Sequence, residues 1–231
     1  MRTPPDETST MEPSGRRERK RIHTSRRLYE AAMQLFEEQG YDETTMDEIA
    51  DLADTARQTV YNYFPRKSSF IDEWAARRRS LAVAGLEKPE TSNRPIAEQI
   101  SLFIRNLVHI NLQTKQLTHV LIPAWVRAGG PIDDAPALSD LIVDFVKLGQ
   151  QRGELDPTRD PTRASNLIRE AYLGALYQWV STGSGENFDL SEAVDDSLEI
   201  IFHGLTKPHA DSDGGVTGKV AQTGSRSSAG S

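Results

Sequence analysis

Residues 45–67 read TMDEIADLADTARQTVYNYFPRK, and this stretch carries the strongest structural signal in the chain. Thr45 is followed three residues later by Glu48, which is the spacing of a capping box at the start of a helix. A second helical segment, ARQTVYNYF, follows almost at once, and Pro65 stops it because proline lacks the backbone N–H that a helix needs. The stretch therefore predicts two short helices joined by a tight turn. The inward residues of the first are expected to be Ile49, Leu52 and Ala53.

An amphipathic helix precedes the two short ones. It is expected to begin near Thr24 or Ser25, either of which can act as an N-cap. It should end at Gly40, because glycine suits the left-handed backbone that follows a helix. Its apolar residues recur at the spacing of one helix face: Leu28, Ala31, Ala32, Leu35 and Phe36. Three helices in this order are typical of a helix-turn-helix, a structure that binds DNA.

The rest of the chain also shows helical periodicity, and strand-like alternation is absent. A fourth helix is expected over about residues 67–86. Its inner residues are expected to be Phe70, Ile71, Trp74 and Leu81. Five more helices are expected, one after Pro95 and four over about 116–128, 135–152, 161–182 and 190–206. The sequence therefore predicts an all-α fold of about nine helices, in which Pro123 can kink one helix.

The third helix has a polar face that suits a major groove of DNA. Successive helical residues advance by about 100°, so with Val60 in the core, Ala56 and Phe64 point the same way. The remaining face carries Arg57, Gln58, Thr59, Tyr61 and Asn62. Arginine pairs with guanine, glutamine or asparagine pairs with adenine, and threonine or a tyrosine ring contacts the thymine methyl. The alternative is an ordinary solvated face, which two tyrosines among so few residues make less attractive.

Charge is distributed unevenly along the chain. The net charge is −7, which alone argues against a simple nucleic-acid binder, but one N-terminal stretch is strongly basic. Its basic residues are Arg16, Arg17, Arg19, Lys20, Arg21, Arg26 and Arg27, against a single acid, Glu18. Phosphate attraction acts within about 8–10 Å, so a local basic arm on an acidic protein can still find DNA. Two interpretations of residues 1–21 stay open, a flexible DNA-binding arm and a solvated tail.

Composition and missing motifs exclude several classes of protein. The 231 residues include no cysteine, which excludes disulfides, cysteine-ligated zinc and thiol nucleophiles. No signal peptide and no membrane-spanning run is recognisable, so we expect a cytoplasmic protein that does not enter a membrane. Catalytic and phosphate-binding motifs are also missing, so we expect no enzyme, no cofactor and no metal. His109 and His119, on different expected helices, give only weak support for shared metal ligation.

Residues 22–82 closely resemble the DNA-binding domain of the TetR family of transcriptional regulators. The resemblance runs through LYEAAMQLFEEQGYDETTMDEIADLA and RQTVYNYFPRKSSFIDEW, and its most specific part is T-V-Y-x-Y-F-x-x-K at Thr59 to Lys67. The turn departs from the family pattern, because Asp54-Thr55-Ala56 stands where Gly-Val-Ser is usual. Aspartate adopts the left-handed conformation at a higher cost than glycine, so we expect a less stable turn.

The resemblance also implies roles for individual residues. Positions that often touch phosphates or bases match Thr45, Thr59, Tyr61, Tyr63 and Lys67. Of these, Lys67 stands where a basic residue at the start of the fourth helix commonly binds phosphate, and Thr45 stands where a helix start approaches the DNA backbone. The variable positions that would set base preference match Arg57, Gln58 and Asn62.

For residues 83–206 the resemblance implies a helical domain that binds a small molecule and dimerises, followed by a disordered tail over 207–231. Candidate residues for its pocket are Trp74, Phe103, His109, Asn111, His119, Trp125, Tyr172 and Tyr177. Plain core packing is the alternative for each of them. The expected function is a repressor that a small-molecule effector releases from palindromic double-stranded DNA. A transcriptional activator of the same fold and a carrier of apolar ligands without DNA function are the alternatives.

The last two helices suggest how a homodimer forms. The helix over 161–182 carries apolar groups on more than one side, so one copy offers limited cover and a two-fold partner would supply the rest. Gly174 and Ala175 are small enough for helices to approach closely. The sequence therefore predicts a homodimer built mainly from these two helices, with Leu176 and Leu198 in the middle of the contact.

Overall fold

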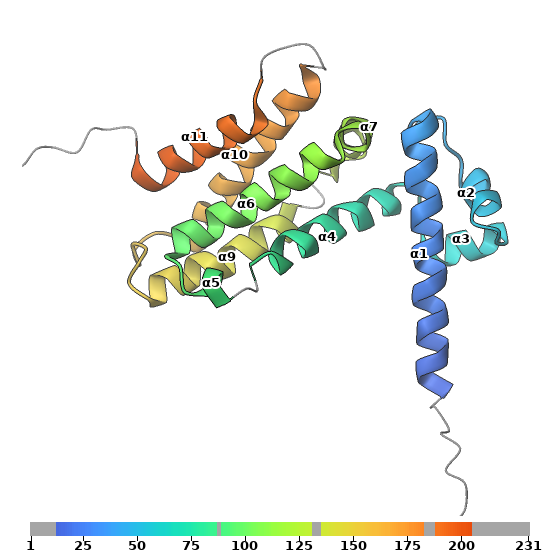
Figure 1. The fold of residues 1–231 in the computed structure, drawn as a ribbon, viewed down its shortest axis with the longest axis horizontal. Helices are drawn as coiled ribbons and strands as arrows, with labels where there is room; N and C mark the ends of the chain where they lie inside the picture. Colours follow the sequence, from blue (N-terminus) through green and yellow to red (C-terminus); the bar gives the residue numbers. More distant parts are fainter. Residues whose placement is uncertain (1–12, 87–88, 131–134, 183–187, 205–231) are drawn as a thin grey trace, which may run out of the picture.

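A computed structural model describes residues 13–86, 89–130, 135–182 and 188–204, and within these ranges the regular elements are all helices (Figure 1). Three of them form the expected helix-turn-helix: α1 (Pro13–Gln39), α2 (Met46–Leu52) and α3 (Arg57–Tyr63). The prediction of an all-α fold with an N-terminal helix-turn-helix is confirmed.

The first helix is longer than its sequence predicts. It begins at Pro13 rather than near Thr24 or Ser25, so the part of residues 1–21 that the structure describes is helical and not a flexible arm. The hydroxyl of Thr24 donates to the carbonyl of Lys20 at 3.0 Å, which is a bond inside a helix and not a cap. Arginine, lysine and glutamate are good helix formers, and they fill the segment before Thr24. The helix ends at Gly40 as expected, with a φ of +92°.

Most of the expected inner residues form the core of the N-terminal part. Leu28, Phe36, Ile49 and Val60 are fully buried, and Phe64 stacks on Phe70 with ring centroids 3.9 Å apart. Two expectations are wrong, because Leu52 and Leu81 are exposed. Each lies about 100° from a buried neighbour, Ala53 at the C-cap of α2 and Ala82 on α4.

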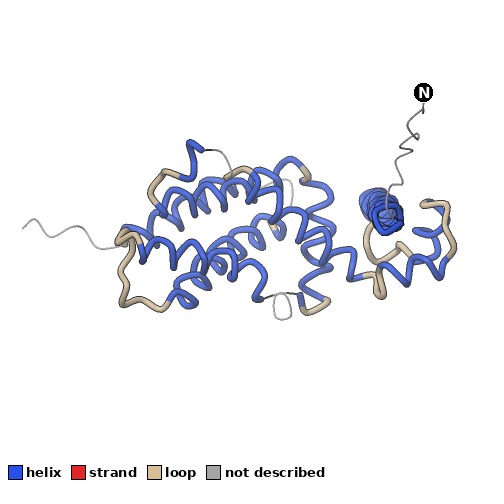
Figure 2. The backbone as a smooth tube through the Cα atoms, turned by 90° about the horizontal axis from the view of Figure 1, so that it is seen from below, coloured by secondary structure: helices blue, strands red, loops and turns tan. Residues whose placement is uncertain are grey.

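The remaining helices form a bundle beside the helix-turn-helix (Figure 2). They are α4 (Ser68–Ala84), α5 (Pro89–Ser92), α6 (Ile96–Gln113), α7 (Lys115–Arg127), α9 (Ala135–Gln151), α10 (Pro161–Ser181) and α11 (Leu190–His203). Helix α10 packs against α9 and α11, and α6 packs against α4, α9 and α11. Helix α4 runs from the helix-turn-helix into the bundle, and α7 packs against α1. Helix α7 continues through Pro123.

The inner faces of α10 and α11 are used within a single copy of the chain. Leu176 and Leu198 are buried in its own core, so the prediction that they sit in the middle of a dimer contact is wrong. The outer side of α10 instead exposes Leu167, leaves open space around Gly174, and lies beside α11, which exposes Ile200. The expected tail over 207–231 lies outside the described residues. In the part of the chain that is described, none of the helices combines the length and the apolar character that crossing a membrane requires.

Candidate nucleic-acid interface and internal cavity

A capping box starts α2, as its sequence predicts. The hydroxyl oxygen of Thr45 accepts from the backbone N–H of Glu48 at 3.2 Å, and the Glu48 carboxylate accepts from the backbone N–H of Thr45 at 2.7 Å. The carboxylate also accepts from the Thr45 hydroxyl at 2.8 Å. The two bonds that Thr45 donates to the carboxylate stabilise its charged form and lower the pKa of Glu48. The Thr45 hydroxyl is thus committed to holding the helix start in place.

In the turn between α2 and α3, Asp54 has a left-handed backbone at the position where the family pattern Gly-Val-Ser has glycine. Asp54 has a φ of +47°, which costs an aspartate more than a glycine. Arg27 of α1 donates from Nη2 to the carbonyl oxygens of Ala53 and Asp54, the latter at 3.1 Å. This side chain therefore satisfies carbonyls at the end of α2 and ties the turn to α1.

The outward face of α3 is arranged as the helical spacing predicts. Gln58 and Asn62 are exposed on one side, and the Gln58 amide donates to the Asn62 side chain at 3.2 Å. Val60 faces the core on the other side, although Ala56, at the N-cap, is exposed. Arg57 forms an exposed ion pair with Asp47 of α2, at 2.7 Å. Two exposed amides therefore project together from the helix.

A basic groove lies between α1 and α3. Thr59 and Tyr63 of α3 line it from one side, and its volume is about 510 Å³. From α1 it is lined by Arg17, Lys20, Arg21, Thr24, Arg27 and Leu28. Figure 1 shows α1 running well past α2 and α3. Because residues 13–21 continue the helix, Arg17, Lys20 and Arg21 lie beside α3.

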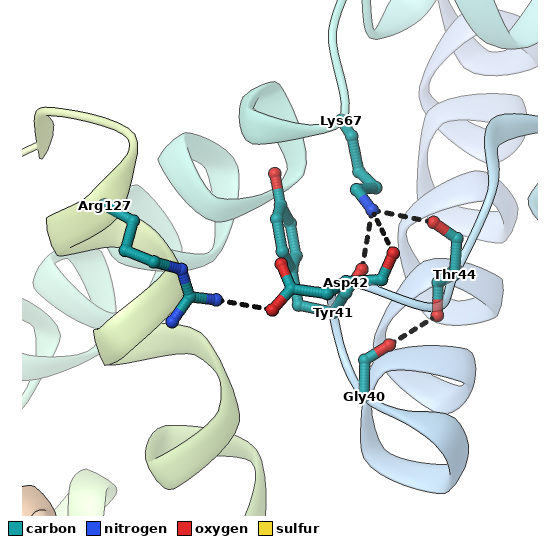
Figure 3. Close-up of polar contacts among 6 residues, drawn as sticks. All are labelled: Gly40, Tyr41, Asp42, Thr44, Lys67 and Arg127. Carbon is teal, nitrogen blue, oxygen red and sulfur yellow. Dashed lines mark hydrogen bonds and ion pairs between the residues drawn. The ribbon is translucent and has the colours of Figure 1, made fainter.

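Lys67 has a different role from the phosphate contact that the family resemblance implies. Its ammonium donates to the backbone carbonyls of Tyr41, Asp42 and Thr44 at 2.7, 3.1 and 2.8 Å (Figure 3). It also lies 4.5 Å from the centroid of the Tyr41 ring. An ammonium has three N–H donors, and these three carbonyls occupy them. Burial lowers the pKa of Lys67. The residue thus holds the loop of residues 41–44, which leads into α2.

The same loop is held from the bundle by α7. Arg127, at the end of that helix, pairs with the Asp42 carboxylate at 2.7 Å (Figure 3). The loop is also tied to α1, because the Thr44 hydroxyl donates to the carbonyl of Gly40 at 2.8 Å. Nearby, the Gln116 side chain donates to the carbonyl of Glu37 at 3.2 Å. Loop 41–44 therefore receives contacts from the start of α4 and from the end of α7.

Helices α4, α6, α7, α9 and α10 line a partly open cavity of about 70 Å³ in the bundle. Four of the expected pocket residues line it: Trp74, Asn111, Trp125 and Tyr172. Its other described lining residues are Ala75, Arg78, Arg79, Leu107, Ile122, Leu138, Arg169, Leu173 and Leu176. A single water needs about 10–15 Å³ by the same kind of measure, so the cavity is small. A ligand with a long apolar chain would have to move the surrounding helices apart.

The other four expected pocket residues do not line the cavity. Phe103 is buried in the core, with its ring centroid 6.2 Å from that of Phe145. His109 is exposed on α6, and His119 lies beside Trp179 with ring centroids 4.5 Å apart. Burial raises the pKa of Tyr177 to about 12. Residue type and place on a helix make these four residues candidates, but neither property says which neighbour a side chain contacts.

Sequence reasoning missed Arg78, which occupies the centre of a buried polar network. Its Nη2 donates to Asn111 Oδ1 at 2.5 Å, to Thr114 Oγ1 at 3.0 Å and to Thr118 Oγ1 at 3.1 Å. Asn111 in turn donates to the Tyr172 hydroxyl at 2.7 Å. Burial lowers the pKa of Arg78 to about 10, so the group stays charged at neutral pH. A signal was present, since Arg78 follows Phe70 and Trp74 at four-residue intervals on the apolar stripe of α4.

A helix-turn-helix with an outward amide face, joined to a helical bundle with an internal cavity, defines a ligand-responsive DNA-binding regulator. Residues 28–73 match the model of the family described as bacterial regulatory proteins, tetR family. An uncharacterised HTH-type transcriptional regulator of Bacillus subtilis, YhgD, is 38% identical over 165 residues, covering 68% of this chain and 85% of that protein. The chain belongs to the TetR family. The turn of Asp54 is thus a departure that the family fold accommodates.

Two further similarities extend beyond the helix-turn-helix. The HTH-type transcriptional repressor KstR of Mycobacterium tuberculosis is 23% identical over 178 residues, covering 77% of this chain and 80% of that protein. The TetR-family repressor FadR of Thermus thermophilus, solved in complex with lauroyl-CoA, matches with a TM-score of 0.62 and 27% identity. That match covers 83% of this chain and all of the other. The expected class, a ligand-responsive transcriptional regulator, is confirmed.

Proposed function

We propose that the chain is a homodimeric repressor that binds a palindromic operator in the cytoplasm through α3, and that acts by binding rather than by catalysis. The observation that carries this proposal is the exposed pair Gln58 and Asn62 on α3, beside the basic groove of α1. Amides supply base recognition, and cations supply phosphate attraction. Two recognition helices about 34–36 Å apart would enter successive major grooves. The domain limits that accompany this proposal are 22–82 for DNA binding, to which the earlier part of α1 adds its basic residues, and 83–206 for effector binding and dimerisation.

The bundle cavity is proposed as the effector site. Apolar groups from several helices line it, which suits a ligand with an apolar body. The similarity to a repressor solved with lauroyl-CoA supports an effector of this kind. Because the cavity is small, such an effector would bind best to a conformation with its helices moved apart, and so it would shift the population toward that conformation.

Coupling between the cavity and the DNA is proposed to run through loop 41–44. Trp74 of α4 and Trp125 of α7 both line the cavity. Each of these two helices also holds the loop, α4 through Lys67 at its N-cap and α7 through Arg127. The loop leads directly to Thr45, the N-cap of α2. A displacement of either cavity wall would therefore reorient the helix-turn-helix, which lowers the affinity for the operator.

The dimer contact is proposed on the outer sides of α10 and α11. Leu167 and Ile200 are exposed there, and Gly174 has open space where a side chain would stand. A glycine at the surface of a helix lets a second helix approach closely. A two-fold contact uses the same patch on both copies, which is also what a palindromic operator requires.

The proposal is tested by selecting DNA fragments from a random pool with the purified full-length protein. We expect enrichment of a palindrome, with base preference at one position in each half changed in Gln58→Ala by about 1–3 kcal/mol. The matched control is Gln113→Ala, which removes an exposed amide from the end of α6, away from α3. If no fragment is enriched, the chain does not act as a sequence-specific regulator, and the carrier of apolar ligands becomes the better interpretation.

A further inference from the structure

The cavity wall holds a buried cation without a carboxylate partner in the described part of the chain. Arg78 is 7% exposed, and each of its hydrogen-bond partners there is a neutral side chain. The guanidinium lies 4.0 Å from the centroid of the Trp74 ring, which is 5% exposed. Taking a charge out of water is costly unless an opposite charge or a full set of hydrogen bonds compensates it. The fold therefore maintains at the cavity a positive charge that its described residues do not neutralise.

The hydrogen bonds around Arg78 leave several donors unused. A guanidinium has five N–H donors, and the described partners of Arg78 are all bound to Nη2, which leaves those of Nε and Nη1. Tyr172 accepts from Asn111, and burial raises the pKa of Tyr172, so its hydroxyl keeps a hydrogen to donate. The Trp74 indole N–H is buried with no hydrogen-bond partner in the described part of the chain. These unused donors would be satisfied by a hydrogen-bond acceptor. Because Arg78 is a cation, a negatively charged acceptor would bind there best.

We propose that Arg78 binds the carboxylate of the effector, and that the effector is an organic acid with an apolar body. This inference rests on the proposed function, since it specifies the ligand of the same cavity. The guanidinium is planar, and two parallel N–H groups match the two oxygens of a carboxylate. Each such pair includes an N–H of Nη2, so a carboxylate bound in this way also takes the place of one of the present Nη2 bonds. The cavity lining also includes the apolar side chains of Ile122, Leu138 and Leu176, which suit a hydrocarbon chain.

A carboxylate fits this position better than the phosphates of a coenzyme A thioester. The cavity is small and Arg78 is deeply buried, so the group that reaches it must be compact. In a thioester the carboxylate has been converted to a neutral carbonyl, and the phosphates lie at the far end of a long polar group. An experiment can therefore distinguish a free carboxylate from the phosphates of coenzyme A by comparing an acid and a thioester with the same hydrocarbon chain.

Binding at Arg78 would also reach α7. Two of the bonds of Nη2 go to Thr114, the N-cap of α7, and to Thr118 in its first turn. A carboxylate that draws the guanidinium toward the cavity competes with these bonds. The opposite end of α7 carries Arg127, whose partner is Asp42 in loop 41–44. A negatively charged ligand at Arg78 can therefore shift α7, the helix whose other end contacts loop 41–44.

The test compares dodecanoate, 1-dodecanol and lauroyl-CoA, which share one chain length, below their micellar concentrations. Binding is measured by calorimetry, and release of a selected operator by fluorescence anisotropy, with full-length protein. The variant is Arg78→Met, which should fold because an apolar side chain of similar length replaces a buried charge. Arg78→Lys retains the charge without the planar fork. The matched control is Arg105→Gln, which removes an exposed arginine of α6 that pairs with Asp195.

We expect wild type and Arg105→Gln to bind dodecanoate about 10- to 100-fold more tightly than 1-dodecanol, and Arg78→Met to lose this preference. Arg78→Lys should retain only part of it. The inference is overturned by equal binding of acid and alcohol to wild type, by a preference that survives in Arg78→Met, or by binding of lauroyl-CoA alone. A protein that holds its operator and ignores all three compounds also overturns it. Failure to bind any operator without a ligand would instead refute the proposed function.

Discussion

The ion pair between Arg127 and Asp42 should matter more for coupling than for stability. Its atoms are 2.7 Å apart, and the side chains are 57% and 70% exposed. Exposed pairs of this kind contribute about 0.2–1 kcal/mol, so Arg127→Gln should lower the free energy of unfolding by no more than that. In a chain of this length the melting temperature would then fall by at most about 4 °C. If loop 41–44 loses the same stabilising free energy, the equilibrium constant for its local opening rises by up to about fivefold.

Arg105→Gln provides a closely matched control for this substitution. The Arg105–Asp195 pair has the same distance of 2.7 Å and comparable exposure, 57% and 43%, but it joins α6 to α11 within the bundle. Both variants lose one positive charge and one exposed ion pair. They differ in whether the pair reaches the loop before α2.

Hydrogen exchange and operator binding together distinguish the two variants. For Arg127→Gln we expect the amides of residues 41–48 to exchange up to about fivefold faster, and operator affinity to fall by up to the same factor. Asp42→Asn should reproduce both effects, and the double variant should add little to either single one. For Arg105→Gln the exchange of residues 41–48 and operator affinity should stay unchanged. Equal behaviour of Arg127→Gln and Arg105→Gln in both measurements would refute the assignment of coupling to this contact.

Three further predictions concern Lys67, the N-terminal segment and α10. Lys67→Met should lower the free energy of unfolding by about 1.5–3 kcal/mol in denaturant titrations, because three carbonyls lose a charged donor. The salt dependence of its DNA binding should not change, whereas a phosphate contact would reduce the slope by about one unit. Removal of residues 1–21 should weaken DNA binding while the rest of the chain stays folded. The slope of the salt dependence should fall by about one unit for each phosphate that this segment neutralises. Unchanged affinity at low salt would show that the segment is a solvated tail. Leu167→Glu should give a monomer mass in light scattering with the fold intact. Leu176→Glu should instead unfold the chain, because Leu176 is buried in the core of one copy. A dimer of unchanged affinity in Leu167→Glu would contradict the contact on α10.

The local structure of the helix-turn-helix could be predicted from the sequence because its determinants lie a few residues apart. The capping box joins Thr45 to Glu48, and Gly40 ends α1 through its own backbone conformation. The outward pairing of Gln58 with Asn62 follows from four-residue spacing on one helix. Even the departure at Asp54 has the left-handed φ that its place in the turn requires. The start of α1 could not be placed, because Thr24 can act as a cap or continue a helix with equal ease.

Which groups the side chains meet across the molecule depends on the packing of the helices. Lys67 is separated by 23 residues from Thr44, Arg78 by 33 from Asn111, and Arg127 by 85 from Asp42. Helical periodicity indicates which side of a helix is buried, but it does not say which other helix covers that side. For this reason the pattern placed Leu176 and Leu198 in a dimer contact that the chain's own core already fills. The family resemblance likewise implied a phosphate contact for Lys67, whose ammonium instead binds loop 41–44. The helices, their order and the outward face of α3 follow from short-range sequence patterns, whereas the cavity, its buried cation and the loop that joins it to α2 exist only once those helices have packed together.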